Sequence, residues 1–167
     1  MKSRTYKNLY KSSLGWNDLE PNMETKQVIV LRKDLNMRKG KMVTQGAHAA
    51  MLAVLREMSV HALGIEPIQE WTLHTNTIKD PLHDWLADRF TKITVGVMSE
   101  DELFEIYKKA LMVEGMVTGT IRMKMPCAII QDAGKTEFHG VPTYTCAAIG
   151  PWWVDEVDEI TGHLPLL

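Results

Sequence analysis

The sequence predicts an α/β protein, a three-layer sandwich around a four-stranded mixed β-sheet. Short, β-branched apolar runs alternate along the chain with longer segments whose apolar residues recur every three or four positions. The predicted order is strand, helix, strand, helix, strand, strand, helix, which places helices against a single sheet. A length of 167 residues suits one domain with one core.

The first strand is predicted at residues 26–32, where the chain is β-branched and apolar. A polar turn separates it from a helix over about 41–58, whose apolar positions follow helical spacing: Val43, Ala47, Ala50, Met51, Val54 and Met58. Residues 61–88 contain Gly64, Pro67 and Pro81 and lack a clear period, so only a short helix near 84–89 is expected there.

The second strand is predicted at 91–97, where apolar and polar residues alternate. Ser99 is a typical N-cap and is followed by three acidic residues, so a helix should run from there to about Val113. Apolar runs at 125–130 and 143–149 predict the last two strands, the second of them ended by Gly150 and Pro151. A short final helix should begin near Trp153.

The chain divides into an N-terminal extension, residues 1–25, and a domain over residues 26–167 with an enlarged segment at about 61–88. The extension has little apolar periodicity, and we expect it to be ordered and to pack on the domain. No run approaches the ~20 apolar residues of a membrane span, so no membrane partner is expected. Two cysteines in buried-type strands favour a reducing compartment and a cytoplasmic location.

The net charge of −2 gives no overall basic field, but the charge is unevenly distributed. Between residues 32 and 41 five basic side chains accompany one acidic side chain: Arg32, Lys33, Arg38, Lys39 and Lys41 against Asp34. Such a cluster could bind a phosphate-bearing partner. The alternative interpretation is an ordinary solvated loop.

Two groups of polar residues are candidates for chemistry. Lys41, Gln45 and His48 are spaced by four and three residues, so they share one stripe near the start of a helix, where anions are favoured. Asp132, Gly134 and Thr136 follow directly after an apolar strand, where open α/β sheets place their sites. The first group could also be a polar solvent-facing surface and the second a simple turn.

Other kinds of site fit the sequence less well. Cys127 and Cys146 lie within apolar strands without a neighbouring histidine, which disfavours a cysteine nucleophile. His61, His74 and His83 do not have a known zinc-ligand spacing. No metal and no cofactor is expected.

Five segments together resemble the type II peptidyl-tRNA hydrolase family. Residues 38–50 are similar to its lysine–glycine–lysine helix, and residues 131–136 to its aspartate–alanine–glycine–basic–threonine motif. Residues 28–35, 145–151 and 161–167 resemble its first strand, last strand and C-terminus, in the same order. The chain departs from the family in its extension, at 61–88, 116–125 and 137–142, and at Gly46, where larger residues are more common.

The resemblance implies a cytoplasmic enzyme of translation that hydrolyses the ester bond of peptidyl-tRNA and so recycles tRNA. The family's proposed catalytic residues fall on Lys41, Asp132, Thr136 and Thr145. Substrate or tRNA binding is expected from the residues beside them: Arg38, Lys39, Gln45, His48 and Lys135. Dimers are common in the family, so a homodimer is a further expectation. The alternative is a tRNA- or RNA-binding module, or a protein-interaction module, without hydrolytic activity.

The reaction needs an aligned water, a stabilised oxyanion and a protonated leaving hydroxyl. We expect Asp132 to orient or deprotonate the water and Thr136 and Thr145 to hold it or relay its proton. Lys41 would stabilise the oxyanion or bind the terminal phosphate. These four residues should then converge in one cleft. A purely structural ion pair between Lys41 and Asp132 is the alternative.

Overall fold

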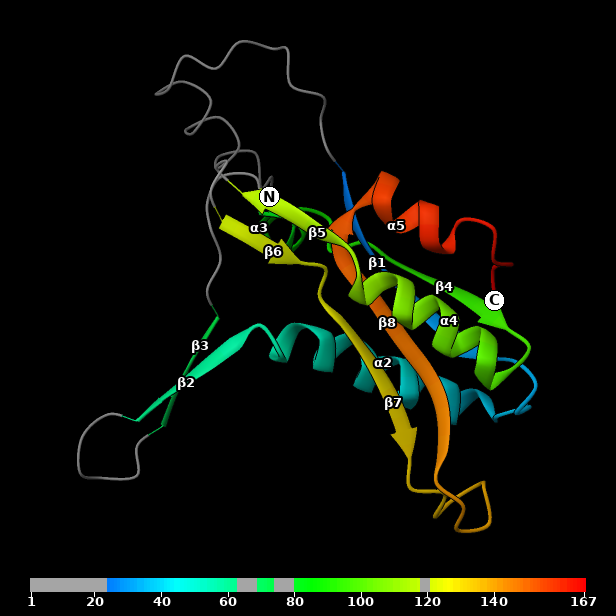
Figure 1. Ribbon diagram of the computed structural model, residues 1–167. Coiled ribbons are helices and arrows are strands. Elements are labelled where there is room, and N and C mark those ends of the chain that lie inside the picture. Colours follow the sequence, from blue (N-terminus) through cyan, green and yellow to red (C-terminus); the bar gives the residue numbers. More distant parts are fainter. Residues whose placement is uncertain (1–23, 63–68, 74–79, 118–120) are drawn as a thin grey trace, which may run out of the picture.

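A computed structural model describes residues 24–62, 69–73, 80–117 and 121–167 (Figure 1). Four strands form a mixed sheet in the order β4 (Lys92–Val97), β1 (Thr25–Arg32), β8 (Thr143–Trp153) and β7 (Cys127–Asp132). Strands β1 and β4 are parallel, whereas β8 runs antiparallel to both β1 and β7. The predicted four-stranded mixed sheet is confirmed.

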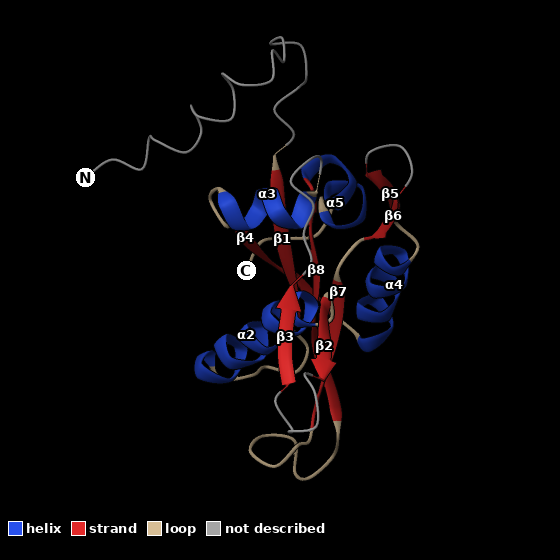
Figure 2. Ribbon diagram, turned by 90° about the vertical axis from the view of Figure 1, so that its left-hand side faces the viewer, coloured by secondary structure: helices blue, strands red, loops and turns tan. Residues whose placement is uncertain are grey.

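Helices cover both faces of this sheet. Figure 2 shows α2 (Lys39–Leu55) and α3 (Pro81–Ala87) on one side and α4 (Glu100–Leu111) and α5 (Val154–Thr161) on the other. Successive residues of β1 point to opposite faces, so Val28 and Val30 join the core beneath α4 and α5, while Ile29 and Leu31 join the core beneath α2. The predicted three-layer α/β sandwich is thus confirmed.

Helix boundaries follow the capping residues. The Ser99 hydroxyl accepts the N–H of Glu102 at 3.1 Å, which confirms the predicted N-cap of α4. The Asp80 carboxylate caps α3, and Pro81 occupies its first turn, so this helix begins three residues before the predicted start at 84. Helix α4 ends at Leu111 and not at Val113, because the chain turns there into a strand at Glu114.

Two β-hairpins extend from the sandwich and were not predicted. One joins β2 (Met58–Ala62) to β3 (Gln69–Leu73), and the other joins β5 (Glu114–Val117) to β6 (Ile121–Lys124). The predicted helix over 41–58 is therefore displaced: it covers 39–55, and Met58 already belongs to β2. In Figure 1 the first hairpin extends from the C-terminal end of α2. Strands of four or five residues carry too little periodic pattern to be identified alone.

Strand β8 also extends further than predicted. It was expected to stop at Gly150 and Pro151, yet pairing with β1 continues to Trp153. The register shifts at Lys26 and Val28, and this irregularity allows the strand to continue past a residue that cannot donate a backbone hydrogen bond.

The apolar face predicted for α2 is not the face that it buries. Val43 and Met51 are 73% and 58% exposed, and the buried residues are Gln45, Ala49 and Ala53. Most of this helix is apolar, so spacing alone did not indicate which side meets the sheet.

Almost all of the N-terminal extension lies outside the described residues, so its predicted packing on the domain stays a prediction. The boundary near residue 25 therefore stays a prediction. None of the helices in the described ranges combines the length and apolar character needed to cross a membrane.

Candidate active site

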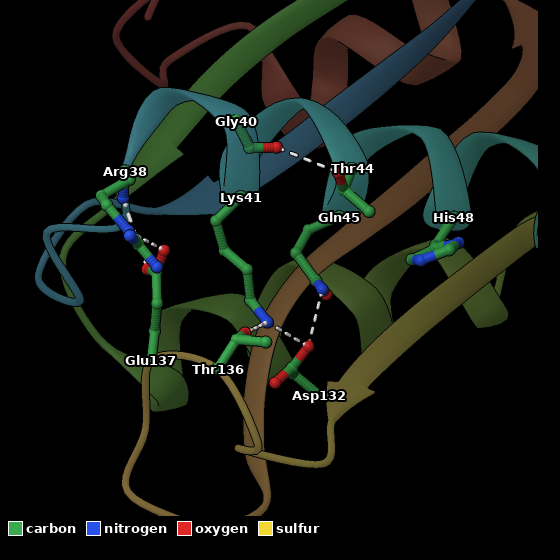
Figure 3. Close-up of a pocket in the computed structure, with 9 residues that line it drawn as sticks. All are labelled: Arg38, Gly40, Lys41, Thr44, Gln45, His48, Asp132, Thr136 and Glu137. Atoms are coloured by element: carbon green, nitrogen blue, oxygen red, sulfur yellow. Dashed lines mark hydrogen bonds and ion pairs between the residues drawn. The ribbon is translucent and has the colours of Figure 1, made fainter.

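A pocket of about 540 Å³ opens between the first half of α2 and the loop that follows β7 (Figure 3). Both groups of residues singled out from the sequence meet here, although they are about ninety residues apart in the chain. The residues that line the pocket are Arg38, Gly40, Lys41, Thr44, Gln45, His48, Asp132, Thr136 and Glu137.

Helix α2 positions its side of the pocket through its packing on the sheet. Lys41 and Gln45 continue the stripe that buries Ala49 and Ala53, so the helix directs both polar side chains toward the end of β7. His48 lies one turn beyond Thr44 and Gln45 on the exposed side of the same wall (Figure 3).

Asp132 accepts three hydrogen bonds. Its Oδ2 accepts from Lys41 Nζ at 2.5 Å and from Gln45 Nε2 at 2.8 Å, and its Oδ1 accepts the N–H of Gly134 at 2.8 Å. The hydrogen bond from the Lys41 ammonium is the main reason that the pKa of Asp132 lies below its usual range, with support from Gly134 and Gln45. The carboxylate is therefore ionised at neutral pH.

Gly134 allows the chain to turn back directly after Asp132. Its φ of +80° lies in the left-handed region, and a Cβ atom there would be 2.4 Å from the backbone oxygen of Val141. A residue with a side chain would strain this loop and displace the N–H that Asp132 accepts.

Lys41 links the two walls of the pocket. Its Nζ donates to Asp132 and, at 3.0 Å, to the hydroxyl of Thr136, and it lies 5.5 Å from the centre of the Phe138 ring. An ammonium group has three donors, so these two acceptors leave one N–H for a ligand. The side chain is 11% exposed, which keeps its charge close to the site and partly shielded from water.

Thr145 lies beneath the pocket and does not line it. Its side chain is fully buried, and its hydroxyl donates to Gln45 Oε1 at 2.7 Å. Gln45 in turn donates to Asp132 and is only 2% exposed. The structure thus brings Lys41, Asp132 and Thr136 into contact and connects Thr145 to them through Gln45.

The basic residues near the pocket occupy different surfaces. Arg38 is at the rim, where its Nε donates to Glu137 Oε1 at 2.6 Å, and this contact lowers the pKa of Glu137. Lys135 is exposed but does not line the pocket, and Lys39 lies on another side of α2, along an apolar groove. Glu137 was not predicted as a site residue; its position directly after Thr136 was the available signal.

The two cysteines are free and buried. Burial raises the pKa of Cys127 to about 11 and that of Cys146 to about 12, so both are protonated at neutral pH and unsuited to nucleophilic attack. Within the described ranges, no three His, Cys, Asp or Glu side chains are grouped so that they could hold a metal ion.

An α/β sandwich with an ion-paired lysine and aspartate in an open pocket has the groups needed to hydrolyse an ester. Comparison with known proteins then identifies the family of hydrolases to which the chain is similar. The family model described as Peptidyl-tRNA hydrolase PTH2 matches residues 25–167. A peptidyl-tRNA hydrolase of Sulfurisphaera tokodaii is 42% identical over 146 residues, which cover 87% of this chain and all of that protein. One of Methanocaldococcus jannaschii is 39% identical over 142 residues, 85% of this chain and 99% of that protein.

The chain therefore belongs to the peptidyl-tRNA hydrolase PTH2 family and is an ester hydrolase that acts on peptidyl-tRNA. Neither comparison supports the alternative of a binding module without hydrolytic activity.

Proposed function

We propose that the pocket around Lys41 and Asp132 is where the ester bond of peptidyl-tRNA is cleaved. The observation that supports this most strongly is the contact of Lys41 Nζ with both Asp132 and Thr136 at the open end of the sheet. A single-turnover assay on a model peptidyl-tRNA tests it: the wild-type chain should release the peptide and free tRNA. Loss of this activity on mutating the pocket, with folding intact, is the supporting result.

Asp132 is proposed to orient the attacking water. Its Oδ1 accepts the N–H of Gly134 and has a second lone pair that can accept a hydrogen of that water. Because its pKa is lowered, Asp132 is a weak base, so alignment of the water contributes more than full removal of its proton. This favours the orienting role over the deprotonating role.

Lys41 and Thr136 are proposed to act on the substrate. When water attacks the carbonyl carbon, negative charge develops on the carbonyl oxygen, and the free N–H of Lys41 can donate to it. The Thr136 hydroxyl accepts from Lys41, so its own hydrogen can point toward the substrate or the water. The ester C–O bond then breaks, and the ribose oxygen takes the proton that the attacking water gives up.

Gln45 and Thr145 are proposed to position Asp132. Replacing Thr145 with Val removes the hydroxyl that orients the Gln45 amide and leaves Oε1 of Gln45 without its donor. We expect the single-turnover rate to fall by about 10-fold, with tRNA affinity unchanged. Thr145→Ser, which restores the hydroxyl, should recover the rate. A Thr145→Val enzyme with the wild-type rate would show that Thr145 does not help to position Asp132.

Arg38, His48 and Lys135 are proposed to contact the acceptor end of tRNA, and Lys39 is not, because it faces the groove. Arg38→Ala should reduce the slope of log affinity against log salt by ~0.7, the value for one lost single-strand phosphate contact. Lys39→Ala is the matched control and should leave the slope unchanged. Equal slopes for wild type and Arg38→Ala would place the tRNA elsewhere.

We also propose a cytoplasmic location, supported by two free, buried thiols and a family that acts in translation. A homodimer is proposed as well, on the basis of an exposed apolar surface on α2.

A further inference from the structure

Glu137 lines the pocket but has no role in the proposed chemistry. It lies on the loop after β7, directly after Thr136, and its side chain is 13% exposed. Its Oε1 accepts from Arg38 Nε at 2.6 Å, and its Oε2 accepts the backbone N–H of Arg38 at 3.4 Å. Figure 3 shows this pair joining the start of α2 to the loop at one end of the pocket. One carboxylate therefore holds the arginine that we propose for contact with tRNA.

The charges that line the pocket cancel. Two cations and two carboxylates are among the described residues of its wall: Arg38, Lys41, Asp132 and Glu137. Each cation lies within 2.6 Å of one carboxylate. The hydrogen bond from Arg38 is the main reason that the pKa of Glu137 lies below its usual range, so this carboxylate is ionised at neutral pH. With His48 neutral, the pocket thus offers no net positive charge to tRNA.

A balanced pocket suits an enzyme whose substrate and product carry the same phosphates. Contacts to these phosphates are equally strong before and after the ester is cleaved, so they do not speed the chemical step. Each additional unpaired cation would, however, tighten the binding of tRNA. A carboxylate that takes back its cation limits this affinity and shortens the time for which cleaved tRNA stays bound.

We infer that Glu137 competes with a tRNA phosphate for Arg38 and so promotes the release of tRNA after cleavage. This inference rests on the proposed contact between Arg38 and tRNA. While tRNA is bound, the guanidinium group turns to the phosphate. When tRNA leaves, Glu137 binds the guanidinium group again.

The exposure of the two side chains fits this exchange. Arg38 is 76% exposed, so its side chain can turn outward to a phosphate, whereas Glu137 stays in the wall of the pocket. Lys41 also lowers the pKa of Glu137, although less than Arg38 does, so the carboxylate keeps a cation nearby when Arg38 is bound elsewhere. Ion pairs that water and salt can reach contribute little stability. Exchange of the carboxylate for a phosphate is therefore easy in both directions.

Two other roles for Glu137 predict a different result. If Glu137 only anchored the loop to the start of α2, its replacement would lower the melting temperature and would not tighten tRNA binding. If Glu137 oriented Arg38 for the phosphate, its replacement would weaken tRNA binding, because a mobile guanidinium group loses more entropy when it binds. A competitor for Arg38 predicts tighter binding.

The first test is the affinity of the full chain for free tRNA at ~50 mM salt. Glu137→Gln keeps the size of the side chain and an acceptor for Arg38 but removes the negative charge, so tRNA should bind at least ~3-fold more tightly. Glu105→Gln is the matched control, because Glu105 pairs with Lys109 at 2.8 Å on α4, across the sheet, and its replacement changes the net charge equally. The control should leave the affinity unchanged. Unchanged or weaker binding by a folded Glu137→Gln chain would overturn the inference.

The second test measures the release of tRNA. Labelled, deacylated tRNA is bound to the enzyme and displaced by an excess of unlabelled tRNA, and its dissociation rate should fall at least ~3-fold in Glu137→Gln. Glu137→Asp keeps the charge and should release tRNA at a rate closer to that of the wild type. If tighter binding came only from faster association, with dissociation unchanged, Glu137 would act on the approach of tRNA, contrary to the inference.

A double-variant cycle tests whether Glu137 acts through Arg38. Glu137→Gln should tighten tRNA binding less in an Arg38→Ala chain than in the wild type, because the guanidinium group that it would free is absent. An equal gain in both chains would mean that the carboxylate only repels tRNA, and the inference would be wrong. Arg38→Ala alone should weaken tRNA binding. If it did not, the proposed contact would fail together with the inference, whereas a failure confined to Glu137→Gln would leave the contact standing.

Discussion

Asp132→Asn is expected to reduce the single-turnover hydrolysis rate by ~100-fold or more while the protein stays folded. Asparagine keeps the size of the side chain and one carbonyl oxygen for Lys41 or Gln45. It loses the negative charge and has one acceptor oxygen where aspartate has two, so the N–H of Gly134 and the proposed water no longer share an acceptor.

Three measurements on this variant separate catalysis from structure. The melting temperature should change little, and affinity for tRNA should stay level or rise slightly, because a negative charge beside the phosphates has been removed. If Asp132 were only a structural partner of Lys41, activity would fall in proportion to the unfolded fraction. A well-folded Asp132→Asn chain that cleaves at the wild-type rate would exclude the proposed mechanism.

The pH dependence of the protein's stability follows from the contact between Asp132 and Lys41. The pKa of Asp132 is lowered in the folded protein, chiefly by its hydrogen bond from Lys41, and is ordinary in the unfolded chain. The stability that this ion pair contributes is therefore fully present above the unfolded pKa and is lost as the pH falls through the folded value. Because the pKa of Asp132 is lowered, its protonation should not limit hydrolysis at pH 5. A loss of hydrolytic activity at pH 5 would therefore have to come from the titration of another group.

Lys41→Met should reduce the hydrolysis rate by ~10²–10³-fold, the range found when one donor to a developing oxyanion is removed. Methionine has a similar length but provides no charge and no N–H, so both the donor to the carbonyl oxygen and the main partner of Asp132 are lost. Carboxyl carbon NMR should show the pKa of Asp132 rising toward its ordinary value.

The comparison of this variant with others identifies what Lys41 does. Lys41→Arg keeps the charge and should retain more activity than Lys41→Met, although its planar donors fit the Asp132 and Thr136 acceptors less well. If Lys41 and Asp132 act as one unit, the double variant will be little slower than the slower single variant. A Lys41→Met enzyme with unchanged rate and weaker tRNA binding would assign Lys41 to the phosphate alone.

The sequence by itself was sufficient for the layers of the fold and for the central contact of the site. Strand β1 and the N-cap of α4 were recognisable because their signals are local: a β-branched run and Ser99 followed by acidic residues. Lys41 and Asp132 could be paired because each lies in a motif that resembles the same family, and the structure places them 2.5 Å apart.

Only the tertiary structure decided which side of α2 is buried, how deep Thr145 lies and where the hairpins form. A helix that is apolar on most sides can pack by any of them, and the choice depends on the sheet beneath it. Thr145 belongs to a strand buried on both faces, where alternation does not show whether a hydroxyl reaches the pocket or Gln45. Short hairpin strands such as β5 and β6 are stabilised by each other, so neither carries a signal of its own.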